Sequence, residues 1–103
     1  MEHAANHKIR LQVEPALKEL MPGFLDNRRR DLERMRQALH EGDLAAIRDV
    51  GQNIRCFSRV YGLEGLTALG EEIRCAAEES CTQRIVLLQG QLADYLSRVE
   101  LAG

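Results

Sequence analysis

Apolar residues recur with a helical period along most of the chain, from residue 15 to residue 101. The longest apolar stripe is interrupted by Pro22, and a proline fits a helix only in its first turn. The stripe should therefore break into a short helix and a long one. The whole pattern predicts five helices, over residues 15–20, 22–41, 44–61, 64–79, and from the cap region at 80–82 to about residue 101.

The predicted helices are joined by short turns. Gly42 and Asp43 suit the end of one helix and the cap of the next, and Gly62 should end the third predicted helix, residues 44–61. Short connections make neighbouring helices antiparallel, so the pattern predicts an all-α fold, an up-down-up-down four-helix bundle. Three glycines lie within helices, where each costs roughly 1 kcal/mol relative to alanine. We expect them to permit close helix contact: Gly51, Gly70 and Gly90.

The first fourteen residues follow a different period. Ile9, Leu11 and Val13 alternate with polar residues, which favours an extended arm over a helix. The arm should lie across the bundle or against another subunit, and residues 1–7 should be frayed. We therefore divide the chain into a partly disordered arm, residues 1–14, and a helical domain, residues 15–103.

Composition narrows the classes of partner. A formal net charge of -2, two Phe, two Tyr and no Trp argue against nucleic-acid binding. Three cysteines without paired spacing favour a reducing compartment over a disulfide framework. No apolar run approaches the length of a membrane span or has the flanks of a leader peptide. We expect a cytoplasmic protein without a membrane contact; its oligomeric state stays open.

The sequence offers little for catalysis or metal binding. Glu71–Glu72 and Glu78–Glu79 are adjacent pairs, and adjacent residues of a helix do not face each other. Cys56, Cys75 and Cys81 lack the spacing of metal ligands. We expect no catalytic residue, no metal and no cofactor. The Arg28–Arg30 run lies between acidic residues and should form a solvated, salt-bridged face.

One stretch, residues 50–62, resembles the signature helix of histidine-phosphotransfer (HPt) domains, His-x-Leu-Lys-Gly-Ser with a later Gly. Ile54 falls on the Leu of the signature and Arg55 on its Lys. Gln52, however, stands at the phosphoacceptor His, Cys56 at the Gly, and Phe57 at the Ser. Three departures within six residues argue against a single engineered replacement and for a natural loss of phosphotransfer.

The resemblance extends over roughly residues 8–100. Residues 22–29, Pro-Gly-Phe-Leu-Asp-Asn-Arg-Arg, resemble the opening of one HPt subgroup. That subgroup also has Gly-Asp before the signature helix, as at residues 42–43, and Tyr-Gly at its end, as at residues 61–62. The resemblance implies the bundle fold that the apolar pattern predicts.

The family site implies a role for the face that carries position 52. In HPt domains the His enters the acidic pocket of a receiver domain, the Lys offsets phosphate charge, and the Gly lets the receiver come close. At helical spacing, Gln52, Arg55, Cys56 and Arg59 share one face and should form an exposed patch, whereas Ile54 points into the core. Phe57 lies at the boundary between the exposed and buried faces of its helix. It should pack near Leu69 on the fourth predicted helix, residues 64–79.

Our leading interpretation is a non-catalytic module that binds the receiver domain of a response regulator, or a histidine kinase, without carrying phosphate. A carboxamide has no nucleophilic nitrogen comparable to imidazole, so Gln52 cannot be phosphorylated in this way. Two alternatives remain: a phosphorelay intermediate with another acceptor, and a structural or oligomerisation bundle. The candidate acceptor, His40, would lie about 18 Å from position 52, at 1.5 Å per helical residue.

Overall fold

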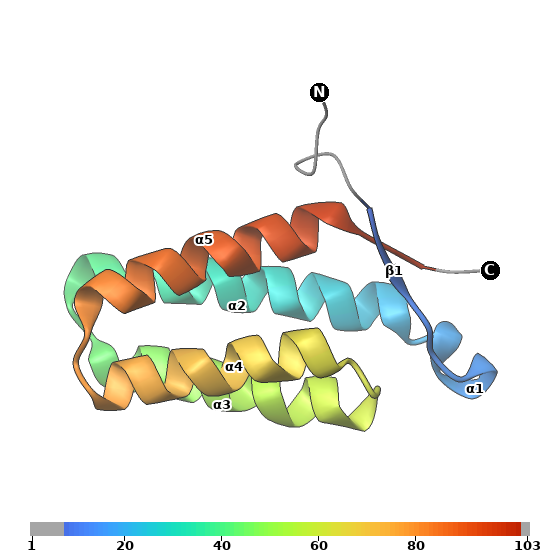
Figure 1. The fold of residues 1–103 in the computed structure, drawn as a ribbon, viewed down its shortest axis with the longest axis horizontal. Helices are drawn as coiled ribbons and strands as arrows, with labels where there is room; N and C mark the ends of the chain where they lie inside the picture. The colour runs from blue at the N-terminus through green and yellow to red at the C-terminus, as the bar shows by residue number, and fades with distance from the viewer. Residues whose placement is uncertain (1–7, 102–103) are drawn as a thin grey trace.

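The structure is a computed structural model that describes residues 8–101 of the 103-residue chain, without the side chains of residues 100 and 101. It is almost wholly helical, which confirms the predicted class. Four long helices lie side by side, with a single short helix at one end (Figure 1). Within residues 8–101, no helix is both long and apolar enough to cross a bilayer. In chain order, the elements are β1 Ile9–Leu11, α1 Pro15–Lys18, α2 Met21–Glu41, α3 Leu44–Val60, α4 Glu64–Glu78, α5 Thr82–Arg98 and β2 Val99–Leu101.

The boundaries of the helices follow the chemistry of their ends. Pro22 occupies the first turn of α2, where its missing N–H costs nothing. Gly42 ends α2 in the left-handed conformation, with φ of 72°, which glycine adopts without strain. The Asp43 side chain then caps α3 by accepting a 3.0 Å hydrogen bond from the backbone N–H of Ala46. The structure confirms the predicted break before the long helix, its end at Gly42 and the start of the next helix after Asp43.

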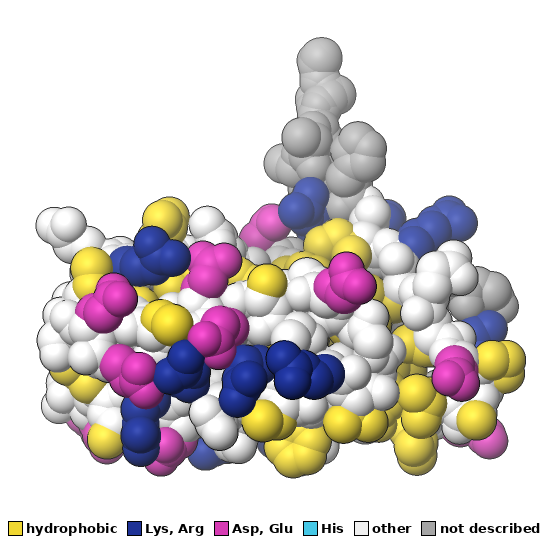
Figure 2. Space-filling model, turned by 60° about the horizontal axis from the view of Figure 1, so that its bottom comes forward, with side chains coloured by type: hydrophobic (Ala, Val, Ile, Leu, Met, Phe, Trp, Pro, Cys, Tyr) yellow, Lys and Arg dark blue, Asp and Glu magenta, His cyan; other side chains and the backbone are white. Residues whose placement is uncertain are grey.

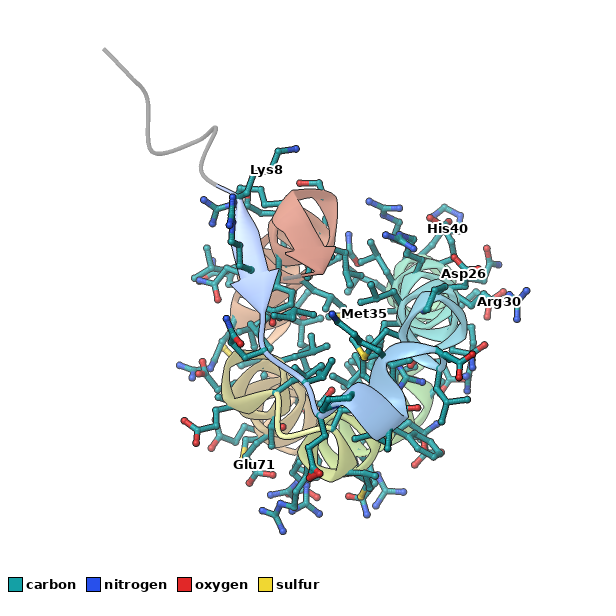
Figure 3. The ribbon with its side chains drawn as sticks, turned by 90° about the vertical axis from the view of Figure 1, so that its right-hand side faces the viewer. Lys8, Asp26, Arg30, Met35, His40 and Glu71 are labelled. Atoms are coloured by element: carbon teal, nitrogen blue, oxygen red, sulfur yellow. The ribbon has the colours of Figure 1, made fainter. Side chains whose placement is uncertain are left out.

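The helices enclose one apolar core. Figure 3 shows Met35 of α2 pointing into the space between the helices, where it is fully buried. Burying a side chain of this size stabilises the folded state by roughly 1.5–3 kcal/mol relative to leaving it exposed. The other apolar side chains with no exposed surface among the described residues are Met21, Ile47, Ile54, Leu66, Ile73, Ala76, Ile85 and Leu92.

The N-terminal segment is extended, as its alternating pattern predicts. β1 pairs in parallel with β2, with Ile9 opposite Val99 (Figure 1). Leu11 is buried, and Ile9 and Val13 pack against the core, so the segment lies on its own helical domain. The expected fraying of residues 1–7 lies outside the described residues.

The pairing of the two strands corrects the predicted end of the last helix. We expected that helix to continue to about residue 101, but α5 ends at Arg98 and Val99 is extended, with φ of -71° and ψ of 139°. Backbone groups that would have continued the helix instead form the ladder with β1. The apolar pattern alone could not reveal this pairing, because its two strands stand at opposite ends of the sequence.

Two glycines bring α3 and α4 into backbone contact. A Cβ atom at Gly51 would lie 2.6 Å from the backbone nitrogen of Arg74 and 2.7 Å from the carbonyl oxygen of Gly70. A Cβ atom at Gly70 would lie 2.5 Å from the backbone nitrogen of Arg55. The predicted close approach is confirmed at these two positions. It is wrong at Gly90, where a Cβ atom would meet nothing within 4 Å.

This difference gives a paired test of helix packing. Gly70→Ala should destabilise the protein by about 2 kcal/mol or more, because the added methyl would press on backbone atoms that cannot move aside. Gly90→Ala should instead stabilise it by up to about 1 kcal/mol, since only helix propensity changes. Urea unfolding followed by far-UV circular dichroism measures both. Equal shifts for the two variants would contradict the assigned contact.

Candidate functional site

The face of α3 that carries position 52 is open to solvent. Gln52, Cys56 and Arg59 are exposed, and Ile54 is fully buried. Their spacing places the three exposed residues on one side of the helix. The exposure predicted from the sequence is therefore confirmed for these three positions. Figure 2 shows the side of the molecule formed by α3 and α4, where basic and acidic side chains make a mixed band. We call Gln52, Arg55, Cys56 and Arg59 the Gln52 patch.

Arg55 is the one member of the Gln52 patch that is not freely exposed. Its side chain is 28% exposed, and its Nε lies 3.3 Å from Oε1 of Glu71 on α4. The positive charge is thus held at the seam between two helices instead of projecting into solvent. Figure 3 shows Glu71 on the outer side of α4, where Arg55 can reach it.

Glu71 is also the centre of a network along α4. It accepts hydrogen bonds from Arg74, whose Nη2 lies 2.6 Å from its Oε2 and whose Nε lies 3.1 Å from its Oε1. Arg74 Nη1 donates to Glu78 at 2.8 Å. The Arg74 hydrogen bond lowers the pKa of the Glu71 carboxyl, against the smaller opposing effect of desolvation. Glu71 therefore stays ionised beside Arg55. Sequence spacing reveals the contacts within α4, but not the contact across to α3.

An open groove of about 590 Å³ runs between α3 and α4, and two residues of the Gln52 patch line it. Its lining residues are Arg55 and Arg59 from α3, Gly62 from the turn, and Glu64, Thr67, Ala68 and Glu71 from α4. Within residues 8–101, the exposed guanidinium of Arg59 makes no ion pair. Arg59 is therefore the positive charge of the patch without an ion-pair partner among the described residues, whereas Arg55 is paired with Glu71.

The prediction for Phe57 is wrong in its partner. The side chain is 51% exposed, and its ring lies on the α2 side of α3, with the guanidinium carbon of Arg28 5.1 Å from the ring centroid. It does not pack near Leu69 on α4. Five residues of helix correspond to a rotation of about 140°, which carries Phe57 away from Gln52. Of the two bulky replacements in the motif, only Cys56 stands close to position 52.

The run from Arg28 to Arg30 divides into two environments. Arg29 pairs with Asp26 at 3.1 Å and Arg30 donates to Asn27 at 3.1 Å, both on the solvated face that we predicted; Figure 3 shows Asp26 and Arg30 pointing outward. The prediction is wrong for Arg28, which is only 5% exposed.

Arg28 is buried because it has a buried partner. Its Nε donates to Oδ2 of Asp31 at 2.8 Å, and Arg34 Nη1 lies 3.1 Å from the other carboxylate oxygen. Desolvation raises the pKa of Asp31, although both arginines oppose the rise. We regard the carboxyl as ionised at neutral pH, because two guanidinium groups contact it directly.

The cysteines and His40 do not form a reactive cluster within residues 8–101. Cys56, Cys75 and Cys81 are free thiols. Burial raises the pKa of Cys75, whose Sγ lies 3.6 Å from Glu71 Oε2, so its thiolate is disfavoured. His40 is exposed in the last turn of α2, on the outside of the helices (Figure 3). Across residues 8–101, no group of three or more His, Cys, Asp or Glu side chains could hold a metal ion.

Comparison of the chain with protein-family models, with curated proteins and with solved structures finds no match. The site is therefore interpreted from its own geometry and from the motif in α3.

Proposed function

We propose that this chain is a non-catalytic, HPt-like signalling module of a two-component phosphorelay. It binds a receiver domain or a histidine kinase and carries no phosphate. In this proposal the helices form an antiparallel up-down-up-down bundle, and the order of colours along α2 to α5 in Figure 1 supports that topology. The observation that carries the proposal is Gln52, exposed in the middle of α3 at the phosphoacceptor position of an HPt-like motif.

The surroundings of Gln52 support a role in binding more than in transfer. A carboxamide offers hydrogen bonds but no basic nitrogen for phosphoryl attack. Cys56, one turn further along, adds an exposed side chain where an HPt domain has glycine. Arg59 supplies an open positive charge on the same face, which suits the acidic pocket that receivers present in the related family. Complementary charge of this kind governs the rate and specificity of association.

The first prediction of this proposal is that the chain accepts no phosphoryl group. Incubated with radiolabelled, phosphorylated receiver domains, the purified protein should remain unlabelled, while an active HPt domain in a parallel reaction takes up label. Acid-labile label on His40 would support the alternative, a relay that uses a different acceptor. Label on any other histidine would also contradict the proposal.

The second prediction concerns restoration of transfer. Gln52→His together with Cys56→Gly should accept phosphate at least about tenfold faster than Gln52→His alone, since a misplacement of about 1 Å can cost on the order of 100-fold in rate. Adding Phe57→Ser should change the rate little, because Phe57 faces α2. Initial rates from one phosphorylated receiver measure all three. A triple variant much faster than the double one would place Phe57 in the docking path.

The third prediction tests the binding face. Arg59→Glu should weaken receiver binding about tenfold at low salt, and the difference should shrink as ionic strength rises. The melting temperature should hardly change, because Arg59 is exposed and unpaired within the described residues. Isothermal titration against the receivers of the same cell measures the affinity.

The control for this test is Arg30→Glu on α2, an exposed arginine that makes no ion pair within residues 8–101 and donates a hydrogen bond to the neutral Asn27. Arg28 cannot serve, because it is buried against Asp31. Arg55→Glu is also unsuitable, since it would place a second carboxylate beside Glu71. If the Arg59→Glu and Arg30→Glu variants bind the receiver equally well, the Gln52 patch is not the docking face. Binding to no receiver and no kinase would favour a structural bundle.

A further inference from the structure

A second site lies on the other side of α3. An open pocket of about 370 Å³ is formed between α2 and α3. We call it the Arg28 pocket. Because Phe57 contributes to it and lies about 140° around α3 from Gln52, the pocket is separate from the Gln52 patch. Its principal lining residues are Leu20, Phe24, Asn27, Arg28, Phe57 and Tyr61.

Aromatic rings hold the guanidinium of Arg28 in this pocket. Its central carbon lies 4.9 Å from the centroid of the Phe24 ring and 5.1 Å from that of Phe57. The Tyr61 ring lies 4.5 Å from the Phe24 ring, centroid to centroid. A cation between aromatic faces gains favourable electrostatic energy while remaining shielded from water. The pocket thus presents a positive group within an apolar wall.

The two terminal nitrogens of Arg28 are available for a further partner. Only Nε is used, in the bond to Asp31. Within residues 8–101, Nη1 and Nη2 make no hydrogen bond, yet they are not sealed from solvent. A guanidinium presents such donors as a planar fork that matches the two oxygens of a carboxylate.

The local charge also favours an anion. Asp31 is shared between Arg28 and Arg34, so two positive charges meet one negative charge. The residues that line the pocket include no carboxylate. Asn27 accepts a hydrogen bond from Arg30 through Oδ1, which leaves its amide nitrogen as another donor.

The rim of the pocket is apolar and exposed. Leu20 is 56% exposed and Phe57 is 51% exposed; Val60, one turn beyond Phe57, is 69% exposed. Hydrophobic side chains gather toward the lower right of Figure 2, at the end of the molecule where α1 lies. An exposed apolar rim around a buried cation is typical of a protein-binding surface.

We propose that the Arg28 pocket binds a segment of a partner protein in which an acidic side chain is flanked by hydrophobic residues. The carboxylate binds the two free nitrogens of Arg28, and the neighbouring side chains cover Leu20, Phe57 and Val60. A free small acid would cover the floor of the pocket and leave this rim in water, so the rim favours a peptide segment as the occupant.

Two matched peptide pools test the proposal. Each blocked peptide has a central Glu, or in the second pool Gln, between positions varied over Ala, Val, Leu, Phe and Tyr. Titrated into the ¹⁵N-labelled protein, the Glu pool should shift the amide signals of Phe24, Phe57 and Tyr61 and the Nε signal of Arg28. The apparent affinity of the Gln pool should be about tenfold weaker, because the bidentate charged contact is lost.

Substitutions at exposed positions test whether the peptide binds at the Arg28 pocket without unfolding the protein. Arg28→Ala would leave Asp31 without its closest partner, so Phe57→Ala, at a half-exposed position, is the primary variant and should weaken binding at least about fivefold. Leu87→Ala on α5, a 62% exposed apolar control, should leave binding unchanged. No shift at millimolar peptide, equal affinity for both pools, or shifts centred elsewhere would overturn the proposal. Phenylacetate binding as tightly as the Glu pool would overturn the peptide assignment.

Discussion

The close approach of α3 and α4 at Gly51 and Gly70 is the constraint on which the candidate surface depends. With a Cβ atom at either glycine within 2.8 Å of backbone atoms of the facing helix, no larger residue fits without moving a helix. Arg55 lies about one turn after Gly51, and Glu71 directly follows Gly70. The packing contact therefore brings these two residues together at the seam, with Arg55 Nε 3.3 Å from Glu71 Oε1. Helix axes further apart would leave Arg55 as an ordinary solvated cation.

The two sides of α3 differ because only one of them carries this contact. Toward α4, small residues bring the backbones together, and the groove above them is open and lined by charged residues. Toward α2, the space is filled by Phe24, Tyr61 and the buried pair of Arg28 and Asp31. These side chains do not fill the space between α2 and α3 completely, and the Arg28 pocket remains open among them. One helix thus presents two chemically distinct surfaces, one on each side.

The sequence predicted the helices well because their signals are local. Pro22, Gly42 and Asp43 act on the backbone next to them, and the element boundaries near them lie within one or two residues of the predicted ones. The exposed and buried positions of α3 likewise follow from helical spacing. What the sequence could not give depends on contacts between distant segments. The strand pair of Ile9 and Val99 is one case, and it shortened the last helix.

The errors at the candidate sites have the same origin. An arginine among acidic neighbours is usually solvated, but this one is buried against Asp31 and beside the rings of Phe24 and Phe57. Phe57 stands at a boundary position, so a small rotation of α3 decided whether it faced α4 or α2. Gly90 shared the mid-helix placement of Gly51 and Gly70 but had no helix close to it. Periodicity identifies the face of a helix, but not the neighbour that the face meets.

Under the proposed function, two of the positions that depart from an HPt signature carry little packing constraint. Gln52 and Cys56 are exposed, so exchanging their side chains changes few contacts and little stability. Gly51, immediately before Gln52, is held by the backbone of α4. An exchange of side chains at Gln52 or Cys56 would therefore leave the packing of α3 on α4 in place. A fold alone does not specify its activity, and the proposed loss of chemistry with retained binding is compatible with this division between exposed and packed residues of α3.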